Sequence, residues 1–128
     1  MKIIIETIPH KKQRYETCGD WQIEKDGTIR ILVSETGDDD YNFLVGLHEA
    51  VEVKLCQKRG ISQTAVDDFD IEFEKQRAKS ITLSNQEPGD NHFAPYQNEH
   101  CIATGIERVV AAALQVKWND YETKLNSL

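Results

Sequence analysis

The stretch from Leu44 to Leu55, LVGLHEAVEVKL, places a histidine and two glutamates inside an otherwise apolar segment. His48 and Glu52 are four residues apart, so on a helix they lie on one face, one turn from each other. An imidazole nitrogen and a carboxylate oxygen at this spacing can bind one metal ion together. The string His48-Glu49-Ala50-Val51-Glu52, or HExxE, therefore predicts a metal-binding helix.

Both polar groups are expected to point at or near the protein core. At about 100° per residue, His48 and Glu52 lie immediately beside an apolar stripe of the same helix. The stripe consists of Leu44, Leu47, Val51 and Leu55. Burying a carboxylate costs several kcal/mol unless something compensates, so Glu52 needs a metal ion, a shared proton or an arginine. The alternative without a metal pairs Glu52 with Arg59 or Arg108 and makes His48 a hydrogen-bonded core residue.

The HExxE string resembles the HExxH helix of the zincin metallopeptidases, with a carboxylate at the second ligand position. The resemblance covers residues 28–55, which read as a strand, an acidic cap and an apolar helix. It implies a zincin-like metal-dependent hydrolase, acting on peptide or amide bonds. By this resemblance His48 and Glu52 would bind one divalent ion, zinc or else manganese or iron, and Glu49 would be the catalytic base that activates water.

Two shorter strings are similar to strings in small uncharacterised bacteriophage and prophage proteins. They are HEAVE at residues 48–52 and APY…EH at residues 94–100. This similarity implies no function. A non-catalytic metal-binding or interaction protein of phage or prophage origin, which has kept a zincin-like core, is therefore an alternative to the hydrolase.

A catalytic zinc site usually has three protein ligands, so His48 and Glu52 need one more. His100, in PYQNEHCIATGIERVV, is the best candidate because it falls at the start of a further expected helix. Glu107 lies two turns later at nearly the same angle. It is predicted to accept a hydrogen bond from a liganding histidine or to be a fourth ligand.

Four more side chains are candidates for contacts around the metal or with a substrate: His92, Tyr96, Glu99 and Arg108. His92 falls in an expected loop, where a plain exposed histidine is the alternative. Glu99 falls in the first turn of a helix, where an acid is favoured by the helix dipole. The substrate itself, a peptide or another small molecule, does not follow from these residues.

A second arrangement of carboxylates suggests different chemistry. Glu49 and Glu52, followed by Asp67 and Asp70, resemble the paired acids of all-helical nucleotide pyrophosphohydrolases, which hold magnesium against phosphates. That family usually has a glutamate where Asp67 stands, and it lacks the N-terminal hairpin expected here. The alternative for this segment is an amphipathic helix with a solvated acidic face.

Composition limits the class of protein. The 128 residues suit a single domain, 1–128, with 39% hydrophobic and 29% charged residues and no apolar run long enough to span a membrane. A net charge of −7 without a segregated basic face argues against nucleic acid as a partner. The N-terminal MKIIIETIPHKK resembles no secretory signal.

The three cysteines, Cys18, Cys56 and Cys101, cannot all pair within one chain and form no CxxC motif, which suits a reducing cytoplasm. Cys56 and Cys101 are either thiolate ligands or ordinary small hydrophobic residues.

The periodicity predicts an α+β fold in which an N-terminal antiparallel sheet packs on about three helices. A hairpin is expected at Trp21–Val33 because Asp26-Gly27 separates two alternating runs, and Lys2–Ile8 is expected to add a strand. A first helix is expected from about Asp40, behind an acidic cap at 38–40, to Lys58, with Gly60 as its stop.

Two further helices complete the expected fold. Residues 62–77 carry apolar groups at helical spacing, with Thr64 and Asp67 placed as a capping pair. A loop is expected at Ser84–Ala94, and the last helix from Pro95 to about Val116. The apolar stripe of that last helix is predicted to consist of Ile102, Ile106, Val109, Val110 and Ala113.

Overall fold

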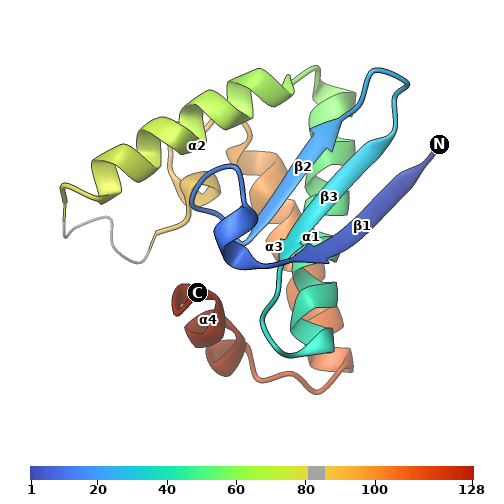
Figure 1. Cartoon of the computed structure of the whole chain (residues 1–128), viewed down its shortest axis with the longest axis vertical. Coiled ribbons are helices and arrows are strands. Elements are labelled where there is room, and N and C mark those ends of the chain that lie inside the picture. The colour runs from blue at the N-terminus through green and yellow to red at the C-terminus, as the bar shows by residue number, and fades with distance from the viewer. Residues whose placement is uncertain (81–85) are drawn as a thin grey trace.

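A computed structural model of the chain describes residues 1–80 and 86–128 and has the α+β architecture expected (Figure 1). Within the described residues, the sheet has three strands and four α-helices accompany it. The elements are β1 (Ile3–Ile8), β2 (Gly19–Ile23), β3 (Ile29–Ser34), α1 (Asp39–Arg59), α2 (Gln63–Arg77), α3 (Gln97–Ala113) and α4 (Trp118–Asn126). Short 3-10 turns lie at His10–Lys12 and Pro88–Asp90.

The sheet is mixed, with strand order β1-β3-β2. The predicted hairpin is confirmed: β2 and β3 are antiparallel, with Trp21 opposite Ile31, and Gly27 in the turn has a φ of 85°. The expected antiparallel pairing of the first strand is wrong, because β1 runs parallel to β3. Residues 9–18 connect β1 to β2 by passing over the end of β3, so β1 and β2 lie on opposite sides of β3. The apolar strand β3 is therefore the central strand, in which Ile31 and Val33 are completely buried.

The predicted ends of α1 are confirmed. The Asp38 carboxylate accepts hydrogen bonds from the backbone N–H groups of Asp40 (2.9 Å) and Tyr41 (3.1 Å). At the other end Gly60 takes the left-handed conformation, with a φ of 72°. Helix α2 lies where it was expected, but its cap is Ser62, whose hydroxyl accepts from the N–H of Ala65. The proposed capping pair of Thr64 and Asp67 is therefore wrong.

The C-terminal part of the chain differs from the expectation of three helices. Helix α3 ends at Ala113 rather than near Val116, because Gln115 takes a positive φ of 60° and turns the chain. Helix α4 follows as a separate element. In the expected loop before α3, residues 86–94 contain one 3-10 turn, whereas Ser84 and Asn85 lie outside the described residues.

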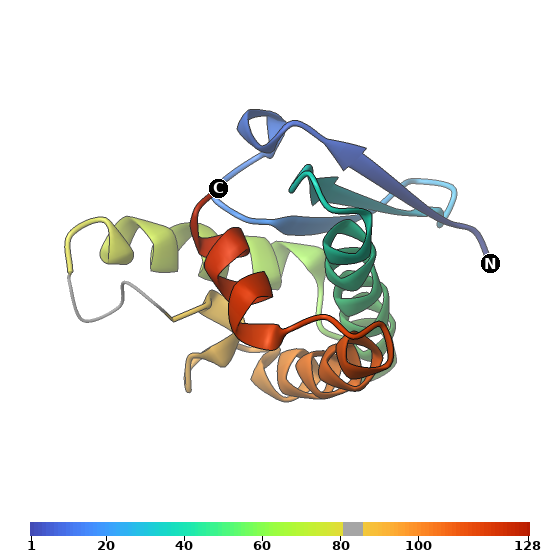
Figure 2. The same ribbon diagram turned by 90° about the horizontal axis from the view of Figure 1, so that it is seen from below.

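The elements form layers that place α1 in the middle. Figure 2 shows the sheet on one side of α1 and α3 on the other, with α2 and α4 toward the left of the view. The apolar core between sheet and helices includes Trp21, Ile29, Ile31, Val33, Leu44, Val53 and Cys56. Among the described helices, none combines the length and apolar character needed to cross a membrane.

The buried face of α3 is not the predicted one. Ile102, Ile106 and Val109 are 44%, 40% and 71% exposed, and Ala113 is exposed too. The residues of α3 that are buried are Glu99, His100, Ala103, Glu107 and Ala111. The helix therefore turns a polar face toward α1 and its apolar stripe outward, because its acids and histidine have partners on α1 and α4.

Candidate metal centre

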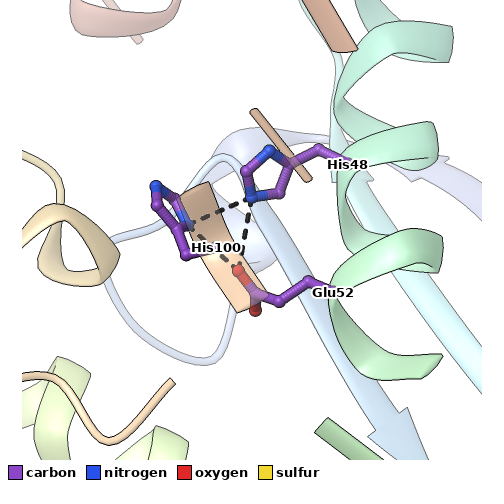
Figure 3. Close-up of side chains that lie close together, drawn as sticks. All are labelled: His48, Glu52 and His100. Atoms are coloured by element: carbon purple, nitrogen blue, oxygen red, sulfur yellow. Dashed lines mark hydrogen bonds and ion pairs between the residues drawn. The ribbon is translucent and has the colours of Figure 1, made fainter. Parts of the chain in front are cut away.

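Three potential ligand atoms meet where α1 and α3 face each other. His48 Nε2 lies 3.3 Å from Glu52 Oε2 and 3.1 Å from His100 Nδ1, and that Nδ1 lies 3.0 Å from the same Glu52 oxygen. Figure 3 shows the two rings and the carboxylate converging, with His48 and Glu52 both carried by α1. All three side chains are buried. The three predicted ligands thus come together.

The triangle has the size that a small divalent ion requires. Tetrahedral zinc with bonds of about 2.0–2.1 Å holds its ligand atoms about 3.3 Å apart, and right-angled coordination brings them to about 2.9 Å. The observed separations of 3.0–3.3 Å lie in this range. Two imidazole nitrogens and one carboxylate oxygen also form a donor set that zinc, manganese and iron accept.

The outer nitrogen of His48 is held by an acid. His48 Nδ1 lies 2.8 Å from Glu107 Oε2, so the ring N–H is donated to that carboxylate and the Nε2 lone pair faces the triangle. The other oxygen of Glu107 accepts a hydrogen bond from the Tyr121 hydroxyl. Glu107 therefore accepts a hydrogen bond from His48, the predicted ligand, and it does not reach the triangle itself.

His100 is oriented in a similar way from the opposite side. Its Nε2 lies 3.2 Å from Glu87 Oε2 and 3.4 Å from Asp90 Oδ1, as ion pairs rather than aligned hydrogen bonds. These acids favour the proton on Nε2 and leave the Nδ1 lone pair toward the triangle. Gly89 lies directly against the ring, and a Cβ at that position would collide with the imidazole. The 3-10 turn at Pro88–Asp90 thus holds the His100 ring in position and places acids beside its outer nitrogen.

When both rings are neutral and carry their protons on the outer nitrogens, three lone pairs meet in the triangle. Both rings then present acceptors to the Glu52 oxygen, which is itself an acceptor. The second oxygen of Glu52 accepts the indole N–H of Trp21 at 3.0 Å, so Glu52 is fixed as well. Buried acceptors at these distances repel one another unless a positive charge sits among them. That charge is either an added proton or a metal ion.

The same requirement appears in the pKa values of the metal-free protein. Burial lowers the pKa of His48, but the hydrogen bonds to Glu107 and Glu52 outweigh burial and raise it to about 10. The pKa of His100 is raised as well, because its acidic partners outweigh burial. Burial opposes ionisation of Glu52, yet the two histidines lower its pKa to about 2. The pocket therefore holds positive charge strongly.

Glu49 lies apart from the triangle but lines the same cavity, whose volume is about 260 Å³. It packs against Gly19 of the edge strand β2, where a Cβ would collide with its carboxylate. Burial and the neighbouring Glu52 raise its pKa well above the ordinary value. A carboxyl group that is poorly solvated and faces a cavity suits proton transfer, which is the role predicted for Glu49.

The arginine alternative for Glu52 is wrong. Arg59 forms its ion pair with Glu99, at 3.2 Å, and Arg108 lies 3.9 Å from Glu122. Glu99 therefore serves as the partner of Arg59 rather than as a metal or substrate contact. Arg108 is exposed and stacks over the Trp118 ring at 4.5 Å, away from the triangle.

The remaining candidates divide between the cavity and the surface. His92 is exposed and its ring lies against Phe93, so the structure does not bring it to the site. Tyr96 is buried, lines the cavity and donates its hydroxyl to Asp70. Tyr15 donates to the other oxygen of Asp70 at 3.1 Å.

The paired acids proposed for magnesium do not assemble. Asp70 is held by the two tyrosines, and Asp67 is bound by Arg14 at 3.0 Å. Among the described residues, neither aspartate belongs to a group of side chains spaced to hold an ion. The geometry gives no support to the nucleotide pyrophosphohydrolase alternative.

The cysteines have structural surroundings. Cys56 is completely buried in the core, Cys101 is exposed, and the Cys18 thiol lies 3.6 Å from the Leu125 carbonyl oxygen. Burial raises the pKa of the Cys18 and Cys56 thiols to about 12, so both are neutral at pH 7. Among the described residues, neither Cys56 nor Cys101 belongs to a group of side chains spaced to hold an ion.

Sequence reasoning missed the residues that surround the ligands: Trp21, Glu87, Asp90 and Tyr121. Trp21 was predicted only as part of the hairpin, and the alternating pattern of that strand does not show that its indole N–H contacts Glu52. Glu87 and Asp90 flank Gly89 in a string otherwise typical of a turn. Tyr121 lies in α4, which was not predicted.

The chain was compared with protein-family models, curated proteins and solved structures, and none of these comparisons gives a match. The zincin-like resemblance and the similarity to phage proteins stay predictions from the sequence.

Proposed function

We propose that the protein is a metal-dependent hydrolase of zincin-like architecture. It binds one divalent ion, with zinc as the expected metal, through His48, Glu52 and His100. The observation that carries the proposal is the convergence of three buried potential ligand atoms, 3.0–3.3 Å from one another, whose side chains each have a further partner outside the triangle.

Each protein group has a distinct role in the proposed reaction. A bound zinc ion would supply Lewis acidity, which lowers the pKa of water to roughly 7. Glu49 takes a proton from water and returns it to the leaving group, since it lines the cavity and stands outside the ligand triangle. Tyr15 and Tyr96 line the cavity beside Asp70, to which both donate their hydroxyls, and they would form one wall around a substrate.

The position of the edge strand supports the zincin-like part of the proposal. Strand β2 is at the edge of the sheet and lies beside α1. It places Gly19 against Glu49 and the Trp21 indole on Glu52. An extended substrate along this edge would meet the proposed ion and the base together, which favours a peptide or amide bond as the substrate class.

Metal analysis tests the first part of the proposal. Untagged protein reconstituted with zinc, manganese or iron is expected to retain about one ion per chain, and His48→Ala and His100→Ala are expected to lose it. His92→Ala is the matched control, because His92 is an exposed histidine remote from the triangle. Wild-type protein that retains none of the three metals would refute the site.

Glu49→Gln tests catalysis separately from binding. The variant is expected to keep its metal while losing hydrolysis of a peptide library by 100-fold or more, as is typical, to order of magnitude, for removal of a general base. If wild-type protein binds zinc and Glu49→Gln has the same activity, the protein is a metal-binding protein without this chemistry.

A further inference from the structure

Helices α1 and α3 carry apolar side chains on the side that faces away from the sheet and the site. On α3 these are Ile102, Ile106 and Val109, which are 44%, 40% and 71% exposed. On α1 they are Leu47 and Val51, both half-buried. In Figure 2 none of the other described helices or strands covers α1 and α3 at the right of the view.

The outward face of α1 has a symmetrical order of residue types. Asp40, Leu47, Val51 and Lys58 follow one another at intervals of seven, four and seven residues. At about 100° per residue, all four lie within about 40° of one another around the helix. An acid thus stands at one end of this face, a base at the other, and two aliphatic residues in the middle.

We propose that this face binds a second copy of the same chain, with the two α1 helices antiparallel about a two-fold axis. An axis midway between Leu47 and Val51 places Leu47 of one copy opposite Val51 of the other. The same register places Asp40 opposite Lys58, twice in each dimer, so the charges are complementary. A parallel arrangement would instead bring like charges together.

Helix α3 fits the same axis. His48 contacts both His100 and Glu107, so the middle of α1 lies beside the middle of α3. The axis then passes near Gly105 and brings Ile102 opposite Val109 of the second copy. Gly105 is exposed and open on its outer side, which lets the helices approach closely.

The available area suits a dimer of modest size. The helices have 21 and 17 residues. At a rise of about 1.5 Å per residue and a width of about 10 Å each, they offer roughly 550 Å² per copy. The total of about 1,100 Å² exceeds the ~1,000 Å² expected of a specific interface. The interface would clamp together the two helices that carry His48, Glu52 and His100, while the cavity stays open on the opposite side.

Sedimentation equilibrium of the full chain at about 10–200 µM tests the interface. The wild-type protein is expected to approach twice its monomer mass of 14.7 kDa. Val109→Glu is expected to shift it to monomer, since it buries an unpaired charge at the proposed contact. Phe93→Glu is the control, because Phe93 is 81% exposed but lies off this face, and it should leave the dimer intact.

A charge-reversal cycle identifies the register. Asp40→Lys and Lys58→Asp should each weaken association several-fold, and the double variant should restore it, because the two residues are proposed to meet across the axis. Circular dichroism confirms folding of each variant. A monomeric wild-type protein would overturn the proposal. It would also be overturned by a dimer that Val109→Glu leaves intact or that Phe93→Glu dissociates. A double variant that associates no better than the two single variants would overturn it as well.

Discussion

Replacing Glu107 by glutamine tests the link between the outer acids and metal binding. The Glu107 carboxylate accepts the Nδ1–H of His48 at 2.8 Å and the hydroxyl of Tyr121. Glutamine keeps the shape of the side chain, but it has one acceptor oxygen and an amide that donates. One of the two buried donors must then lose its acceptor, and His48 loses the negative charge that stabilises its orientation.

The expected loss follows from the contact that is removed. Changing an acid that orients a liganding histidine typically weakens metal affinity about 10- to 100-fold, or about 1.4–2.7 kcal/mol. A buried donor without an acceptor costs about 1–3 kcal/mol, which is the same range. Because His48 is 7% exposed, water cannot readily replace the lost acceptor. We therefore expect zinc affinity to fall by between one and two orders of magnitude while the stoichiometry stays at one.

Competition with a chromophoric chelator at pH 7 measures this change. Glu122→Gln is the matched control, because Glu122 is an exposed acid on α4 that lies 3.9 Å from Arg108 and far from the ligands. Both variants change the net charge equally. If Glu107→Gln binds zinc as tightly as Glu122→Gln, the acid does not orient His48 for a metal and the reasoning is wrong.

Three further predictions address the surroundings of the triangle. Gly89→Ala should displace the His100 ring and weaken zinc binding at least about 10-fold in the same assay, whereas Gly105→Ala, where an added Cβ meets open space within the chain, should leave zinc binding unchanged. In metal-free protein the pKa of His48 is about 10 against about 6.5 unfolded. The stability that it contributes is therefore complete below pH ~6.5, and up to about 5 kcal/mol is lost as pH rises to 10. Thermal unfolding with a chelator at several pH values will measure this decline, which an unchanged free energy of unfolding from pH 6.5 to 10 would contradict. Burial raises the pKa of Asp70 to about 7 from 3.8, so the wild-type protein should lose up to about 4 kcal/mol as pH rises from about 4 to 7. Asp70→Asn should flatten that slope in urea titrations, and a slope like that of the wild type would count against the raised pKa.

The sequence predicts α1 and the burial of His48 and Glu52 on it well because the signals are local. The acidic cap at 38–40 and Gly60 determine the ends of the helix, and a spacing of four residues places His48 and Glu52 together on any helix. Periodicity also places both of them at the core side. The identity of His100 as their neighbour required only that the later helix pack against the first.

The partners of the ligands could not be predicted because they depend on contacts between distant segments. Glu107 is 59 residues from His48 in the sequence, and the Trp21 indole is 31 residues from Glu52. No periodicity encodes which tautomer a histidine adopts or which acid reaches its outer nitrogen. The parallel pairing of β1 was missed for the same reason, since a crossing over β3 leaves no short-range signal.

The error in the buried face of α3 follows from a conflict between two contributions to stability. Apolar periodicity favours burying Ile102, Ile106 and Val109, yet these are the exposed residues, and Glu99, His100 and Glu107 are inside. A helix adopts this orientation only if the buried polar groups have partners strong enough to offset desolvation, and here Arg59, His48 and Tyr121 supply them. Binding of a metal ion would stabilise this orientation further, because the positive charge of the ion does not depend on protonation of the histidines. Because the polar face of α3 points inward, its apolar stripe is exposed to solvent and the free energy of burying that stripe is lost. Association of two copies through the stripe would recover part of this hydrophobic stabilisation. The ligand triangle and the proposed dimer face both follow from the same orientation of α3 about its own axis.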